Sequence, residues 1–239
     1  MTGPHLRARI EDVDHLDALR GEGATFAGVL ERADAGLPVP TCGEWRLREL
    51  AHHLGGVHRW AAAAVLGDGT PPAEDAPPLP PDNALADWFR EGLDVLTAAL
   101  ADSGRPCWTL AGPATAAWWR RRQALETAVH RVDAERVLGP ARPIDPALAA
   151  DGVAEVVDVL HPRQLRLGRA TVPAAALRLT TDGGQGSWLV AGPSPITEIS
   201  GPAETLLLLL WGRTDLDDPR LQVEDRRRAQ AVLAEPLTP

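Results

Sequence analysis

Residues 118–137, WWRRRQALETAVHRVDAERV, carry an apolar and a polar stripe side by side at helical spacing. The apolar stripe consists of Trp118, Leu125, Val129 and Val132, and the polar stripe of Gln123, Glu126, His130 and Asp133. This pattern predicts an amphipathic helix whose apolar stripe packs into a core. Because Glu126 and His130 are four residues apart, both project from one face and can bind one metal ion. The alternative is an ordinary helical pair, with Arg122 as the second partner of Glu126.

This helix, expected over about 113–138, is the last of four in the first part of the chain. Apolar periodicity and breaking residues predict the other three at 11–34, from Thr41 or Gly43 to about Leu66, and at about 84–101. The proline-rich stretch 67–83 and the segment 103–113 are expected to be loops. Four helices of this length predict an antiparallel four-helix bundle.

The pattern changes near residue 142. Residues 145–160 predict a further helix, and the segment 170–200 alternates apolar and polar residues around glycine-rich turns, which indicates two or three antiparallel strands. Residues 201–213 predict a buried helix, and residues 220–235 a short strand and a last helix. We therefore expect the fold class α + (α+β), with a helical bundle over 1–142 and a small α+β domain with an antiparallel sheet over 143–239.

Charge and hydropathy exclude several classes of partner. The net charge of −9 argues against nucleic acid, whose phosphates are bound by clustered positive charge. The longest apolar run, LLLLLW at 206–211, is far shorter than the roughly 20 residues of a membrane span. The first 15 residues lack a signal-peptide core, so we expect a cytoplasmic protein, and a monomer is the default. The two cysteines, Cys42 and Cys107, form no disulfide framework and are not expected to be nucleophiles.

The segment HHLGGVHRW, residues 52–60, offers three histidines that could complete a metal site. On a helix His52 points away from the apolar face, whereas His53 and His58 lie at its two edges, so the geometry leaves these two as candidates. Either histidine, together with Glu126 and His130, gives a two-histidine, one-carboxylate set that leaves coordination positions open, as catalytic metal sites do. Asp133 could orient a ligand or pair with a neighbouring arginine.

Residues 39–65, VPTCGEWRLRELAHHLGGVHRWAAAAV, together with WWRRRQALETAVHRVDAE at 118–135, resemble the mycothiol-dependent maleylpyruvate isomerase family. The resemblance implies that the first domain is a DinB-like metal-binding bundle. Residues 145–163 and 201–213 are similar to the C-terminal domain of that family, which is related to sterol carrier proteins. The family's metal ligands fall on His53, Glu126 and His130, and a basic residue of its active site falls on Arg213. An arginine there could equally be stabilised by the end of a helix.

The resemblance implies a zinc ion that binds the thiol of mycothiol, a low-molecular-weight thiol. The expected partner is an electrophilic small molecule. Its reaction would be either cis–trans isomerisation of a maleylpyruvate-like substrate or S-transfer, in detoxification or natural-product biosynthesis. Two alternatives remain open: a ferrous-iron enzyme on the same bundle, which the same ligand set would suit, and a non-enzymatic metal- or ligand-binding module. Trp60 and Trp119 could line the pocket or belong to the core.

Overall fold

The computed structural model describes residues 13–73, 77–184 and 186–239. These residues belong to two compact units, one formed by Asp14–Arg142 and the other containing Pro143–Pro239. Within the described ranges, no helix is long and apolar enough to cross a membrane.

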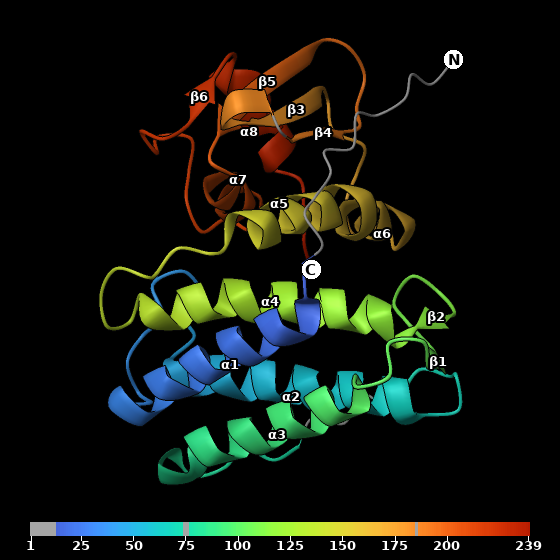
Figure 1. The fold of residues 1–239 in the computed structure, drawn as a ribbon. Coiled ribbons are helices and arrows are strands. Elements are labelled where there is room, and N and C mark those ends of the chain that lie inside the picture. The colour runs from blue at the N-terminus through green and yellow to red at the C-terminus, as the bar shows by residue number, and fades with distance from the viewer. Residues whose placement is uncertain (1–12, 74–76, 185) are drawn as a thin grey trace. The chain divides into compact units, whose positions relative to one another are not determined.

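The first unit is a four-helix bundle (Figure 1). Its helices are α1 (His15–Arg32), α2 (Leu47–Leu66), α3 (Leu85–Ala99) and α4 (Ala116–Glu135), with a short 3-10 turn, η1 (Asp82–Ala84), before α3. Helices α1 and α2 each pack against both α3 and α4. Fully buried leucines and two phenylalanines fill the space between them, and the rings of Phe26 and Phe89 lie 4.6 Å apart. The helical bundle confirms the prediction from sequence.

Helix α2 begins later than the sequence pattern predicts. The segment before it folds back on itself, with a β-bridge between Pro38 and Arg46. The carboxylate of Glu49 accepts a hydrogen bond of 2.9 Å from the backbone N–H of Arg46, which fixes the helix start at Leu47. This loop brings Thr41 toward α4, as described below.

Helix α4 also begins later than predicted, at Ala116. The preceding segment contains a small hairpin in which β1 (Pro106–Cys107) pairs antiparallel with β2 (Ala114–Thr115). Its two-residue strands are too short to give a periodic signal, so the sequence indicated only a loop.

The second unit has a four-stranded sheet with helices packed on it and on one another. Its helical segments are α5 (Pro146–Glu155), the π-helical η2 (Val156–Leu160), α6 (His161–Arg166), the 3-10 turn η3 (Asp182–Gly184), α7 (Ala203–Leu210) and α8 (Arg226–Leu233). The strands are β3 (Ala176–Thr181), β4 (Ser187–Val190), β5 (Ile196–Gly201) and β6 (Gln222–Val223), and their order in the sheet is β4-β3-β5-β6. Helices α7 and α8 contact β3 and β5, and α5 packs against α7.

The expectation of a purely antiparallel sheet is wrong. Strands β3 and β4, like β5 and β6, are antiparallel, but β5 runs parallel to β3 with Ala176 opposite Ile196. After β4 the chain crosses the start of β3, where the N–H of Ala176 donates to the carbonyl of Pro193 at 3.0 Å. Only glycine fits at residue 192, because a Cβ there would lie 2.2 Å from the Ala175 carbonyl oxygen. An alternating pattern identifies strands but not their neighbours.

The helix predicted over 145–160 continues to Arg166. It passes through the π-helical segment Val156–Leu160 and into α6, where Pro162 occupies the first turn. A proline inside a helical run removes one backbone hydrogen bond. Here it directly follows the π-helical segment, where the N–H of His161 bonds the carbonyl of Val156 and the regular α-helical bonding is already interrupted.

Candidate metal centre

Helices α2 and α4 bring three predicted ligands together inside the bundle. His53 comes from α2, and Glu126 and His130 come from successive turns of α4. The Oε1 atom of Glu126 lies 3.3 Å from Nε2 of His130 and 3.5 Å from Nε2 of His53. One donor atom from each residue lies within 4.8 Å of the other two. We call these three residues the ligand trio.

The spacing of the ligand trio suits a small divalent ion. Ligands about 2.0–2.1 Å from a tetrahedral zinc ion lie about 3.3–3.4 Å from one another. The two distances from Glu126 Oε1, 3.3 and 3.5 Å, are close to that separation and longer than a usual N–H···O hydrogen bond. Two imidazoles and a carboxylate are also a donor set that zinc commonly takes. The residues present therefore fit the zinc ion that the family resemblance implies.

Glu126 is an ionised carboxylate although it is buried. Burial by itself raises its pKa, but the Arg122 guanidinium and the two imidazoles of the ligand trio lower the pKa well below its usual value. Arg122 lies one turn before Glu126 on α4, and its Nη2 donates to Oε2 of Glu126. Both side chains are less than a tenth exposed, 6% for Arg122 and 8% for Glu126. The pair therefore supplies a charged oxygen ligand inside the bundle.

His130 is held by its other ring nitrogen. Nδ1 lies 2.9 Å from Oδ2 of Asp133, a fully buried carboxylate, which leaves Nε2 facing Glu126. Asp133 in turn accepts a hydrogen bond of 2.6 Å from Thr41 Oγ1 and one of 3.4 Å from Cys42 Sγ. A carboxylate on Nδ1 fixes the ring orientation and the tautomer of a metal-binding histidine.

Without a bound metal ion, the surroundings of His130 favour the charged form of its imidazole. Burial lowers its pKa, but its contacts with Asp133, Cys42 and Glu126 raise the pKa well above the usual value. The atoms of Cys42, His130 and Asp133 form a second compact group of potential ligands. That group shares His130 with the ligand trio.

The other two histidines of the 52–60 segment have different roles. His52 points away from the ligand trio, as predicted: its Nε2 donates to the carbonyl of Pro77 at 2.7 Å, and its ring stacks on Trp88. His58, which the helical geometry left as a candidate, is fully buried and bonds Thr127 Oγ1 through Nε2 at 2.9 Å. Burial lowers its pKa to about 3, so it is neutral. Neither histidine belongs to the trio.

One tryptophan lies beside the ligand trio, and others cluster about two turns farther along α2 and α4. The ring of Trp45 lies 5.1 Å from that of His53, a neighbour that the sequence analysis missed. Trp60 contacts Trp119 at 5.5 Å, and Trp119 is only 1% exposed, with its Nε1 donating to the carbonyl of Trp108. Trp119 is therefore a core residue. Since His53 faces Glu126 and Trp60 faces Trp119, α2 and α4 run antiparallel.

Arg213, the predicted active-site arginine, follows α7 in the second unit. Its Nη1 donates to the carbonyl of Trp211 at 2.7 Å, and its backbone N–H donates to the carbonyl of Leu208. These contacts agree with an arginine placed at a helix C-terminus, where exposed carbonyls attract positive charge. A role in catalysis stays a prediction.

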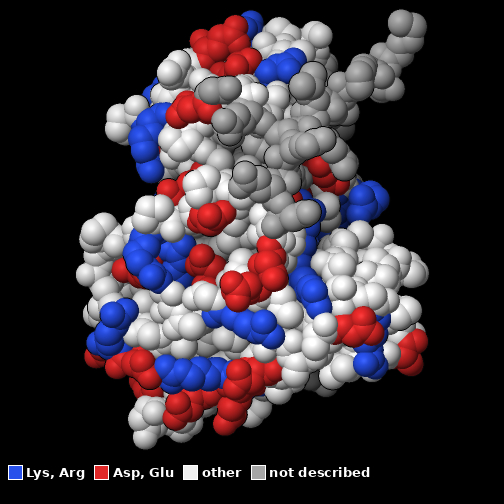
Figure 2. Space-filling model, viewed as in Figure 1, with Lys and Arg blue, Asp and Glu red and all other residues white. Residues whose placement is uncertain are grey.

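The surface of the bundle carries charges of both signs. Figure 2 shows acidic and basic side chains interspersed over it. Many of them are paired, among them Arg48 with Asp82 at 3.0 Å and Arg142 with Glu135 at 2.9 Å. Exposed ion pairs of this kind contribute little to stability.

Comparisons with known proteins agree with this description. A family model for the mycothiol maleylpyruvate isomerase N-terminal domain matches residues 16–135, and one for the MDMPI C-terminal domain matches residues 147–231. The structure is similar to a crystal structure of the mycothiol-dependent maleylpyruvate isomerase, with a TM-score of 0.67 and 15% identity over 90% of this chain and 94% of that one. A histidine-to-alanine mutant of that isomerase gives a TM-score of 0.63 at 15% identity, over 84% of this chain and 90% of that one. No curated protein matches. At this identity the structural likeness shows the fold alone.

Proposed function

Since the chain belongs to the mycothiol maleylpyruvate isomerase family, we propose that it is a mycothiol-dependent zinc enzyme that activates a thiol for attack on an electrophilic small molecule. The observation that carries the proposal is the convergence of His53, Glu126 and His130 at separations that suit zinc. Three protein ligands leave a position for a further ligand, which is the arrangement of catalytic zinc sites.

Each side chain of the proposed site has a distinct role. His53, Glu126 and His130 bind the ion, and Asp133 holds His130 with Nε2 toward it. The His53 side chain is 37% exposed, whereas Glu126 and His130 are almost completely buried. The side of His53 is therefore where a thiol cosubstrate enters, and Trp45 provides an apolar surface beside it.

A divalent ion bound there would lower the pKa of a coordinated thiol, which is otherwise mostly protonated at neutral pH, and would convert it to the nucleophilic thiolate. The substrate class that follows is an electrophile: either an activated cis-alkene such as maleylpyruvate, for isomerisation, or a compound that accepts the sulfur. In this proposal Arg213 pairs with a carboxylate of the substrate or of mycothiol, because its planar fork matches a carboxylate in two hydrogen bonds.

The test compares zinc content, mycothiol affinity and turnover in the wild type with two single-histidine variants. We expect about one zinc per wild-type chain and binding of mycothiol only to the zinc-loaded protein. His53→Ala should lose both zinc and mycothiol, whereas His52→Ala, which alters the neighbouring residue, should keep both. Turnover of maleylpyruvate or of an alkylating electrophile then distinguishes isomerase from S-transferase.

Three results would overturn the proposal. Zinc retained by His53→Ala would place the ion elsewhere. Iron in place of zinc in protein purified without added metal would identify a ferrous enzyme. Metal binding without any reaction of mycothiol would identify a binding module.

A further inference from the structure

The two oxygens of the Glu126 carboxylate face different partners. Oε2 accepts from the Arg122 guanidinium, while Oε1 faces the imidazoles of His53 and His130. Because Arg122 and Glu126 are one helical turn apart on α4, the backbone itself sets this pairing. One oxygen is thus reserved for the arginine and one for the space that the imidazoles share.

We propose that Arg122 is a positioning residue that limits Glu126 to a single-oxygen contact with the metal. The inference rests on the proposed function, since it concerns the ion that the site would hold. A carboxylate can bind an ion through one oxygen or through both. With Oε2 engaged by Arg122, only Oε1 is available, so Glu126 occupies one coordination position rather than two.

The consequence concerns the number of ligands around the ion. A second carboxylate oxygen would take a position that a catalytic zinc site keeps open for its exchangeable ligand. Arg122 therefore reserves that position for the thiol cosubstrate. This role requires a guanidinium that stays in place, and the Arg122 side chain, 6% exposed, is confined by its surroundings.

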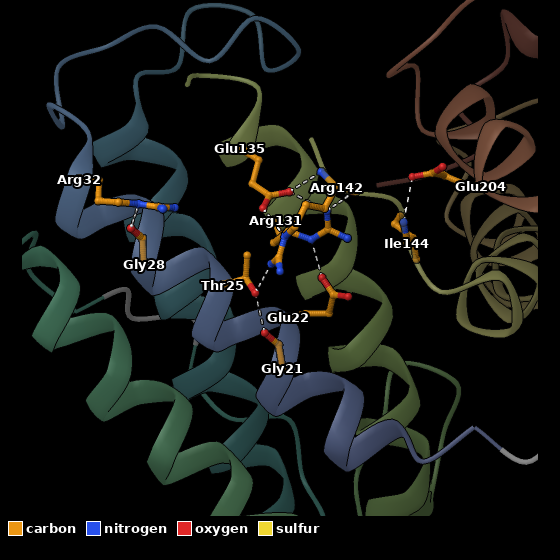
Figure 3. A network of polar contacts seen from close by, with 10 residues as sticks. All are labelled: Gly21, Glu22, Thr25, Gly28, Arg32, Arg131, Glu135, Arg142, Ile144 and Glu204. Atoms are coloured by element: carbon orange, nitrogen blue, oxygen red, sulfur yellow. Dashed lines mark hydrogen bonds and ion pairs between the residues drawn. The ribbon is translucent and has the colours of Figure 1, made fainter. Parts of the chain in front are cut away.

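The same helix offers a matched control. Arg131 is also buried, 2% exposed, and it also pairs with a glutamate four residues later, Glu135, at 2.8 Å. Figure 3 shows that Arg131 points toward Glu22 and Glu135 in a network between α1 and the end of α4, and Nε of Arg131 lies 2.5 Å from Glu22. Removing Arg131 therefore deletes a buried arginine–glutamate pair whose acidic partners, Glu22 and Glu135, lie outside the ligand trio.

The experiment measures metal binding to the full-length chain rather than activity. Arg122→Met, Arg122→Lys and Arg131→Met are titrated with Zn²⁺ against a chromophoric chelator. Each variant is then loaded with Co²⁺, whose visible absorption is strong at four-coordinate sites and weak at six-coordinate ones. For Arg122→Met we expect a zinc affinity lower by about 10- to 100-fold, as is typical when a residue that orients a ligand is lost, and a weaker Co²⁺ band as Glu126 binds through both oxygens.

Arg122→Lys, which keeps a charged donor, should recover part of both signals. Arg131→Met should lower the free energy of unfolding but leave the zinc affinity and the Co²⁺ spectrum as in the wild type. An Arg122→Met protein with wild-type affinity and spectrum would overturn this inference while leaving the proposed function intact. A wild type that binds neither ion would overturn both. If Arg122→Met does not fold, Arg122→Gln replaces it, with the same expected direction and the same overturning result.

Discussion

Replacing Asp133 by asparagine tests how the structure prepares His130 for a metal. The carboxylate is fully buried and accepts hydrogen bonds from Thr41 Oγ1 at 2.6 Å and from His130 Nδ1 at 2.9 Å, through different oxygens. Asparagine has the same shape but only one acceptor oxygen. If that oxygen stays on Thr41, the amide NH₂ faces His130 and donates to Nδ1. The ring proton then moves to Nε2, the nitrogen that faces Glu126, and removes the lone pair that would bind the ion.

The size of the effect follows from these two arrangements. Loss of an orienting carboxylate typically lowers metal affinity by about 10- to 100-fold, which corresponds to about 1.4–2.7 kcal/mol of binding free energy. The upper end applies if the amide keeps its oxygen on Thr41 and forces the wrong tautomer of His130. The lower end applies if the amide flips. Thr41 then accepts a hydrogen bond from the amide NH₂, the amide oxygen still accepts from His130 Nδ1, and only the negative charge of Asp133 is lost.

The assay is a competition titration of Zn²⁺ into Asp133→Asn, with circular dichroism to verify the fold. Glu135→Gln is the matched control, because Glu135 lies on the same helix and accepts from Arg131 and Arg142 rather than from the ligand trio. We expect the control to bind zinc as the wild type does. A folded Asp133→Asn protein whose zinc affinity stays within about twofold of the wild type would refute the claim that Asp133 orients His130.

Two further predictions concern stability. Burial lowers the pKa of His58 to about 3 in the folded state, below the usual 6.5 of the unfolded chain, so this residue contributes stability above about pH 6.5 that is lost as the pH falls toward 3. His58→Gln can still bond Thr127. Between pH 7 and pH 4 its free energy of unfolding, measured with urea, should fall by roughly 3 kcal/mol less than that of the wild type. Equal falls in the two proteins would contradict the claim that His58 is neutral in the folded state. Phe26 is fully buried, so Phe26→Ala should lower the free energy of unfolding by about 3–5 kcal/mol, and a loss below about 1 kcal/mol would show that the bundle core repacks around it.

Local periodicity was sufficient to predict the helices and two of the three residues of the ligand trio. Glu126 and His130 share a helix, so their spacing alone places both side chains on one face. Periodicity could not decide between His53 and His58 as the third ligand, because both lie at an edge of α2. The packing of α4 distinguishes them: Thr127 takes His58 as a buried partner, whereas Glu126 faces His53.

Contacts between distant segments could not be predicted in this way. Thr41 and Cys42 reach Asp133 across about 90 residues of sequence, and the loop that carries them has no periodic pattern. Their alignment depends on the fold of residues 38–46, which hydrogen bonds within the loop determine. The parallel pairing of β3 with β5 could not be predicted for a similar reason. It depends on a close crossing of the chain at Gly192, and the alternation of apolar residues does not indicate such a crossing.

The most direct test of the central claim is X-ray absorption spectroscopy of the zinc-loaded protein with and without mycothiol. Without the thiol, we expect only nitrogen and oxygen ligands at about 2.0–2.2 Å, from two imidazoles, one carboxylate and water. Addition of mycothiol should introduce one sulfur ligand at about 2.3 Å while the imidazole signal persists. An unchanged spectrum after mycothiol is added would mean that this site does not bind the thiol, and the proposed mechanism would fail.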